Sequence, residues 1–171
     1  MLKAAIVMGS DSDLGVLSAA ASVLEHFSVP FEIKVLSAHR TPEAALAYAA
    51  SAEKRGFGVL IAGAGGAAHL PGVLAAVTTL PVIGVPMNAT SLNGLDSLLS
   101  IVQMPSGIPV ATVGVNAAKN AALLAVQILA VKEGALKPKL KAYRAAMKKE
   151  VLAKTAKLDK KGYKKYLEEM K

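Results

Sequence analysis

Short apolar runs with the length of strands recur along much of the chain. The runs at 4–8, 59–62 and 81–85 are apolar at nearly every position, which is typical of strands buried on both faces of a parallel sheet. The run at 31–35 alternates apolar with charged residues, which indicates one exposed face. A further apolar run covers 108–113. The pattern therefore predicts five strands.

The segments between these runs have apolar residues at helical spacing. The first predicted helix begins at Leu14. The second begins at Pro42, with Thr41 as its N-cap, and runs to about Arg55, before Gly56. Three further helices are predicted. They cover 70–77, the segment that follows a loop at 86–93 and ends at about Val102, and 116–131.

Strands and helices that alternate in this way predict an α/β fold. We expect a three-layer sandwich with a five-stranded parallel sheet and right-handed crossovers, in the flavodoxin-like strand order 2-1-3-4-5. Two further amphipathic helices are predicted at 135–158 and 160–170. The predicted organisation is an α/β domain at 1–133 followed by a C-terminal helical extension at 134–171.

The charge of the chain is unevenly distributed. Residues 1–131 contain six Lys or Arg and seven Asp or Glu, a net charge of −1, whereas residues 132–171 contain fourteen and five, a net charge of +9. A basic segment could bind nucleic acid, but these lysines alternate with apolar and acidic residues, as on a solvated helix face. We therefore expect no nucleic-acid partner.

The middle of the chain is almost free of charge. From Gly56 to Val131 only Asp96 and Lys119 are charged. Because a stretch of this length normally exposes many more charges to water, we expect other subunits to cover much of its surface. The helix at 116–131 is apolar almost all round and is the first candidate for packing between subunits.

The composition also limits the chemistry and the location. The chain has no cysteine, so it has no disulfide or thiolate nucleophile, and we expect a cytoplasmic protein. The apolar start of the chain is interrupted at Gly9, too early for a signal peptide. No apolar run reaches the roughly 18 residues of a membrane span, so no membrane partner is expected.

Two of the three histidines follow predicted strands. His39 lies in the loop after 31–35, and His69 lies in the glycine-rich loop after 59–62. The carboxyl ends of parallel strands share one edge of the sheet, where ligands bind, and imidazoles there suit proton transfer near neutral pH. A lone loop histidine is otherwise usually a surface residue. His26, late in the first helix, is interpreted as structural or solvated.

The segment Gly9-Ser10-Asp11-Ser12-Asp13 opens the first helix at the same edge. Its hydroxyls and amides suit a phosphate and its carboxylates suit ribose hydroxyls, although Ser12 or Asp13 could simply cap the helix. A metal site built on Asp11 and Asp13 is disfavoured because no third ligand lies nearby in the sequence. Arg40 precedes a helix N-terminus, where it is poorly placed for helix stability and well placed for an anion.

The loop Gly63-Ala64-Gly65-Gly66-Ala67-Ala68 partly matches the dinucleotide-binding fingerprint. We reject that interpretation because the loop follows the third strand and no acidic residue ends the next one. Two interpretations stay open. The glycines either permit a tight strand-to-helix turn, or they bring backbone N–H groups to a small anionic or carboxylated group.

Taken together, these segments resemble the aminoimidazole ribonucleotide carboxylase/mutase family. The motifs that carry the resemblance are 8–13, 37–42, 62–72, 81–86, 92–98, 100–105 and 120–125, in the family's order. One branch of the family rearranges N5-carboxyaminoimidazole ribonucleotide, and the other carboxylates 5-aminoimidazole ribonucleotide with free CO2. The loop 64–70 and the arginine that follows His39 resemble the rearranging, or mutase, branch.

The resemblance implies conversion of N5-carboxyaminoimidazole ribonucleotide to 4-carboxy-5-aminoimidazole ribonucleotide in purine biosynthesis. The implied route is decarboxylation, retention of CO2 and recarboxylation at C4, in a homo-octamer without metal or cofactor. The alternatives are a direct carboxylase that uses free CO2 and a non-enzymatic nucleotide-binding module with a basic nucleic-acid tail.

The resemblance also implies roles for individual residues. His39 would be the general acid/base. The implied substrate-binding residues are Ser10, Ser12, Ser37 and Arg40 at the 5′-phosphate, Asp13 at the ribose hydroxyls, and Gly65, Ala67, His69 and Leu70 in a pocket that retains CO2.

Overall fold

The computed structural model describes residues 1–88 and 92–170. The chain divides into two compact units, Met1–Gly134 and Ala135–Lys171, and each is described by itself. Part of the loop expected at 86–93 lies outside the described residues.

The first unit is built on a parallel sheet of five strands in the order β2-β1-β3-β4-β5, which confirms the predicted fold class. The strands are β1 (Lys3–Met8), β2 (Phe31–Val35), β3 (Phe57–Gly65), β4 (Val82–Met87) and β5 (Ala111–Thr112). The three central strands are buried along almost their whole length, which is why their sequences are apolar on both faces. β2 lies at an edge and is half-exposed, in keeping with its alternating sequence.

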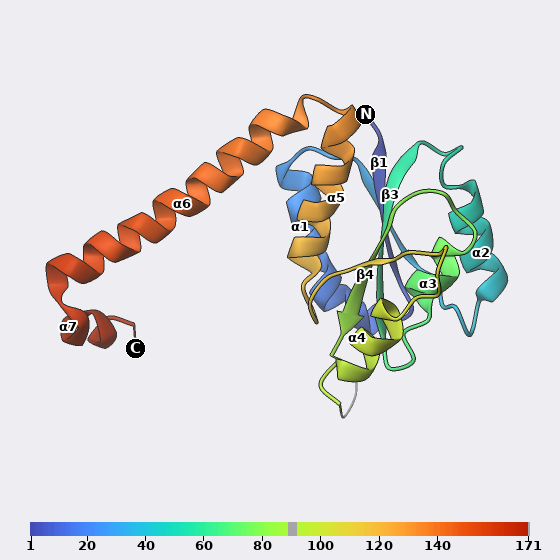
Figure 1. The fold of residues 1–171 in the computed structure, drawn as a ribbon, viewed down its shortest axis with the longest axis horizontal. Coiled ribbons are helices and arrows are strands. Elements are labelled where there is room, and N and C mark those ends of the chain that lie inside the picture. The colour runs from blue at the N-terminus through green and yellow to red at the C-terminus, as the bar shows by residue number, and fades with distance from the viewer. Residues whose placement is uncertain (89–91, 171) are drawn as a thin grey trace. The chain divides into compact units, whose positions relative to one another are not determined.

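Helices cover both faces of the sheet (Figure 1). α1 (Leu14–His26) and α5 (Ala118–Lys132) pack against each other on one face. α2 (Pro42–Ser51), α3 (Leu70–Ala75) and α4 (Leu95–Val102) lie on the other, where Tyr48, Leu74 and Ile101 share one apolar core with alternate residues of β1, β3 and β4. The molecule therefore has the three layers that the sequence predicts.

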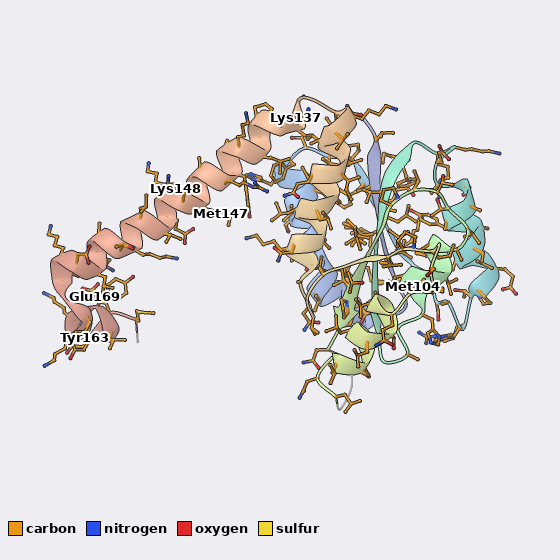
Figure 2. All side chains as sticks on the ribbon, in the orientation of Figure 1. Met104, Lys137, Met147, Lys148, Tyr163 and Glu169 are labelled. Carbon is orange, nitrogen blue, oxygen red and sulfur yellow. The ribbon has the colours of Figure 1, made fainter. Side chains whose placement is uncertain are left out.

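Small residues let these layers approach closely. A Cβ atom at Gly63 of β3 would lie 2.7 Å from Cδ1 of Leu17 in α1, so a larger residue there would require the buried Leu17 side chain to move. Gly84 of β4 lies in the same way beneath the buried side chain of Ile101. Met104, just after α4, packs against Gly72 of α3 (Figure 2). α4 is thereby held tightly on β4, next to the carboxyl end of the sheet.

Three elements of the first unit differ most from their predicted extents. β3 runs from Phe57 to Gly65 instead of covering 59–62, so the first three residues of the glycine-rich segment 63–68 belong to the strand. α2 ends at Ser51, and a series of turns follows in which the Arg55 N–H donates to Ser51 and Ala52, up to Gly56 with φ +82°. β5 pairs at only two positions although 108–113 is apolar, and Pro109 has no N–H for a ladder in the first half of that run.

The second unit consists of α6 (Leu136–Lys161) and α7 (Tyr163–Glu168), joined at Gly162 with φ +74°. Glu169 forms ion pairs with Lys157 and Lys161 of α6, and these two lysines lower the pKa of its carboxyl to about 2 (Figure 2). These ion pairs fold α7 back toward the end of α6. Among the described residues, none of the helices combines the length and the apolar character needed to span a bilayer.

Candidate active site

The site lies at the carboxyl ends of three neighbouring strands. Met8, the last residue of β1, pairs with Val35, the last residue of β2, and with Gly63 of β3, which runs two residues further to Gly65. The loops after β1, β2 and β3 therefore leave the sheet at the same edge. A cleft of about 470 Å³ opens among these loops. Its lining residues are Gly9, Ser10, Ser12, Asp13, Ser37, Ala38, His39, Arg40, Ala64, Gly65, Gly66, Ala67, His69 and Leu70. All ten residues that the sequence nominated are brought together in this one cleft.

The loop after β1 contributes two hydroxyls and a carboxyl. The Ser10 hydroxyl caps the short turn η1 (Asp11–Asp13) by accepting the Ser12 N–H at 3.4 Å, and it also accepts the Ser12 hydroxyl at 2.9 Å. Asp13 stands at the N-cap of α1 but makes no capping hydrogen bond. The capping explanation for Ser12 and Asp13 is therefore wrong.

Asp13 is a largely buried carboxyl on the wall of the cleft, with 7% of the residue exposed. Burial raises the pKa of the Asp13 carboxyl, and a hydrogen bond from Ser12 partly counteracts that rise. A carboxylate that is short of water gains when a ligand hydroxyl donates to it, because that bond replaces lost hydration. Asp13 is thus suited to hold the hydroxyls of a sugar.

The loop after β2 forms a tight turn in which Ser37 is central. The Ser37 hydroxyl accepts the N–H groups of His39 at 3.3 Å and Arg40 at 3.1 Å. Thr41 begins α2 as predicted, but its hydroxyl bonds back to Ser37, accepting the N–H at 2.9 Å and donating to the carbonyl at 3.1 Å. Thr41 therefore stabilises the turn instead of capping the helix through its side chain.

Arg40 crosses from this loop to the loop after β1. Its Nη2 atom donates to the carbonyl of Gly9 at 3.0 Å, which leaves the rest of the guanidinium fork for a ligand. The hydroxyls of Ser10, Ser12 and Ser37 line the same cleft. A cation, several hydroxyls and the N-terminal ends of α1 and α2 together favour a doubly charged oxyanion such as a phosphate.

His39 and His69 are in direct contact. Nε2 of His39 lies 2.8 Å from Nδ1 of His69, and the two rings are nearly perpendicular, at 89°. Only one proton can lie between these nitrogens, so one ring must donate and the other accept. Both rings are exposed to the cleft, and a proton can pass between them or to a bound ligand. The sequence placed both residues at this edge without indicating that they touch.

The glycine-rich loop after β3 closes the third side of the cleft. Gly66 has φ +62°, a conformation that L side chains rarely adopt, and this turns the chain away from the sheet toward α3. Its N–H donates to the hydroxyl of Ser97 in α4 at 2.9 Å. Sequence reasoning missed Ser97. The available signal was a serine in a short helix that also contains Asp96 and Ser100, which by itself does not single Ser97 out.

Within the described parts of the chain, no three His, Asp or Glu side chains come together in a way that could hold a metal ion. The chemical groups that line the cleft are three serine hydroxyls, a guanidinium, one carboxyl, two imidazoles and the backbone of the glycine-rich loop.

Comparison with known proteins places this arrangement in a family. Residues 3–150 match the family model described as AIR carboxylase. The chain is 61% identical over 164 residues to N5-carboxyaminoimidazole ribonucleotide mutase of Pyrococcus horikoshii, covering 96% of this chain and 93% of the relative. It is 57% identical over 167 residues to the protein of the same name from Thermotoga maritima, covering 98% of each.

A longer relative and a solved structure extend the comparison. Phosphoribosylaminoimidazole carboxylase of Saccharomyces cerevisiae is 57% identical over 163 residues, but the match spans 28% of that protein. A crystal structure of Treponema denticola PurE superposes with a TM-score of 0.83 at 30% identity, covering 92% of this chain and 99% of that one.

Proposed function

The chain belongs to the AIR carboxylase family, and from that membership we propose that it converts N5-carboxyaminoimidazole ribonucleotide to 4-carboxy-5-aminoimidazole ribonucleotide. Relatives named as mutases match it over 93% to 98% of each chain. The Saccharomyces cerevisiae relative, which is named a carboxylase, is a much larger protein, of which this chain corresponds to 28%. The observation that carries the proposal is the cleft in which Arg40, three serine hydroxyls and the His39–His69 pair converge.

We propose that Ser10, Ser12, Ser37 and Arg40 bind the 5′-phosphate of the ribonucleotide. The phosphate would receive hydrogen bonds from the hydroxyls and a charge-assisted bond from the guanidinium. Asp13, with its raised pKa, would accept the ribose hydroxyls. These contacts would hold the imidazole ring beside His39 and against the glycine-rich loop.

We assign the proton transfers to His39. As the N5–carboxyl bond breaks, protonated His39 donates its proton to N5, and CO2 and 5-aminoimidazole ribonucleotide form. C4 of the imidazole then attacks CO2 to form the new carbon–carbon bond, and neutral His39 removes the proton from C4. One proton leaves His39 and one returns, so the enzyme ends in its starting state without a cofactor. His69, in contact with Nε2 of His39, would orient that ring.

Retention of CO2 between the two steps decides the yield. Gly65, Ala67, His69 and Leu70 would form the pocket that holds it. CO2 that is held next to C4 reacts without having to diffuse back from solution. CO2 that escapes into water leaves 5-aminoimidazole ribonucleotide as the end product. A small apolar gas requires a close-fitting wall, and a loop of glycine and alanine brings the backbone close to it.

The test follows the carboxyl group. The substrate is labelled with carbon-13 in its N5-carboxyl, and the reaction runs in unlabelled bicarbonate. A mutase gives product that keeps the label, whereas a direct carboxylase gives unlabelled product. Saturable carboxylation of 5-aminoimidazole ribonucleotide at low bicarbonate would likewise favour the carboxylase. A protein that binds the nucleotide without turnover would support the non-enzymatic module.

We also propose a homo-octameric, cytoplasmic enzyme in which the helices of residues 134–171 pack on neighbouring subunits. Exposed apolar side chains support self-association. α4 has Leu95, Leu99 and Val102 on its outer side, and Val131 near the end of α5 is 82% exposed. The family resemblance supplies the number of subunits. Light scattering coupled to gel filtration tests it, and a monomeric mass would contradict the proposal.

A further inference from the structure

Ser97 is a fully buried polar side chain close to the cleft. It lies in the first turns of α4, and its residue is 0% exposed. Its hydroxyl accepts the Gly66 N–H at 2.9 Å and donates to the carbonyl of Met87 at 2.9 Å. One hydroxyl therefore joins the loop after β3 to the end of β4, and both of its hydrogen-bonding functions are in use.

The position of this hydroxyl explains how the two strands part. β3 and β4 pair in register up to Gly65 and Met87, which form their last pair. A direct bond from the Gly66 N–H to the Met87 carbonyl would continue the parallel ladder. The Ser97 hydroxyl stands between these two groups instead. The hydroxyl accepts the Gly66 N–H and donates to the Met87 carbonyl, so these two groups are bridged and do not bond directly. Gly66, with φ +62°, then turns the chain away from β4.

We propose that Ser97 is a positioning residue that sets the shape of the CO2-retaining wall. It touches no reacting atom, and the inference rests on the proposed mutase function. The wall residues Gly65 and Ala67 flank the one amide that Ser97 holds. Without the hydroxyl, the Gly66 N–H loses its acceptor and the Met87 carbonyl loses its donor. Gly65 and Ala67 then shift relative to His39.

Ser100 provides a matched control on the same helix. It lies one turn after Ser97, and its hydroxyl donates to the Asp96 carbonyl of its own helix at 2.7 Å. Its contact with the Gly66 carbonyl is long, at 3.5 Å. Ser100→Ala removes the same atom from the same element but leaves the Gly66 amide bonded. The two substitutions therefore separate loop positioning from a general effect on α4.

The experiment compares wild type, Ser97→Ala and Ser100→Ala in the labelled-carboxyl assay, with added unlabelled bicarbonate. For Ser97→Ala we expect the product to lose several-fold more of its label than in wild type. We also expect several-fold more 5-aminoimidazole ribonucleotide to be released for each molecule of product formed. Its kcat should fall, while KM stays within about twofold, because the phosphate-binding groups lie on other loops. Ser100→Ala should match wild type. Equal label retention in both variants would overturn the proposal, even if Ser97→Ala lowers thermal stability.

A second measurement does not depend on catalysis. Hydrogen exchange of the peptide that contains Gly66 should be faster in Ser97→Ala than in wild type or Ser100→Ala, and unchanged exchange would contradict the inferred bond. Failure of the proposed function has a different signature. In that case wild type itself shows no label transfer, while the exchange result stands.

Discussion

Polar side chains gather at both ends of the sheet in the first unit, and their pairing differs. At the amino end, Glu32 accepts from Lys3 at 3.0 Å and also pairs with Arg55. Arg55 stacks over Tyr48 and Phe57, with its guanidinium carbon 4.6 and 5.0 Å from the ring centres. Hydrogen bonds from Lys3 and Arg55 lower the pKa of Glu32, and burial together with the Glu32 charge raises the pKa of Tyr48 to about 12.

At the carboxyl end, Arg40 and Asp13 have no such ion-pair partners among the residues that the structure describes. Arg40 donates to a backbone carbonyl, and among the described residues it forms no ion pair with a carboxylate. Burial raises the pKa of the Asp13 carboxyl, and the hydrogen bond that partly offsets this rise comes from Ser12 and not from a cationic side chain. The comparison shows that paired charges stabilise the fold, whereas a charge left with unused hydrogen-bonding capacity can bind a ligand. Arg55 is a charge of the first kind, and we propose that Arg40 is one of the second.

The largest expected effect comes from His39→Asn. Asparagine keeps a polar side chain of similar reach but cannot exchange a proton near neutral pH, so kcat should fall by at least about 100-fold. Steady-state rates with N5-carboxyaminoimidazole ribonucleotide measure this, and thermal unfolding should stay near that of wild type. His26→Asn, on the far part of α1, is the matched control. More than about a tenth of the wild-type rate in His39→Asn would rule out a general acid/base role.

Arg40→Ala should affect binding more than stability. Loss of a charge-assisted contact to phosphate is expected to raise KM by about 10- to 100-fold, with the free energy of unfolding within about 0.5 kcal/mol of wild type. Arg40→Lys should recover only part of the affinity, because an ammonium cannot reproduce the fork. Kinetics and denaturant titration measure the two quantities. An unchanged KM would exclude Arg40 from the phosphate site.

Arg55→Ala should give the opposite result. It removes one ion pair and the stacking on two aromatic rings, so the free energy of unfolding should fall by about 1–2 kcal/mol. KM and kcat should stay at wild-type values because the residue lies at the other end of the sheet. If Arg55→Ala changed KM as much as Arg40→Ala does, the functional contrast between the two ends would be lost.

The smallest effect is the pH dependence of the Glu32 cluster. The pKa of Glu32 lies below its ordinary value of 4.5 in the folded protein, so its contribution is fully present above that value and disappears as pH falls through the folded pKa. We expect Glu32→Gln to cost about 1 kcal/mol at neutral pH and nothing in strong acid. Urea titrations over that range measure it, with Glu25→Gln as control. A cost that does not depend on pH would indicate lost packing rather than lost charge.

Much of the fold followed from local patterns, and the family resemblance completed the membership of the site. The apolar runs located the strands, and every residue nominated for the cleft lies at or just beyond the carboxyl ends of the first three strands. This worked because parallel strands direct their carboxyl ends to one edge, so loops distant in sequence converge there. Predictions were less accurate in detail at helix ends, where local turns compete with the helix. Thr41 is the N-cap residue as predicted but its hydroxyl bonds to its own turn, and turns replace the last part of the helix predicted to reach Arg55.

The sequence by itself determined the order of elements, the edge at which the loops meet and the kinds of chemical group present there. Only the tertiary structure decided which of those groups touch. The His39–His69 contact joins residues thirty positions apart, and Ser97 bonds to Gly66 thirty-one positions away. Hydrogen bonds depend on a few tenths of an ångström, and such distances are set by strand register and by how closely α4 packs on β4. Local patterns in the sequence carry no information on these two quantities.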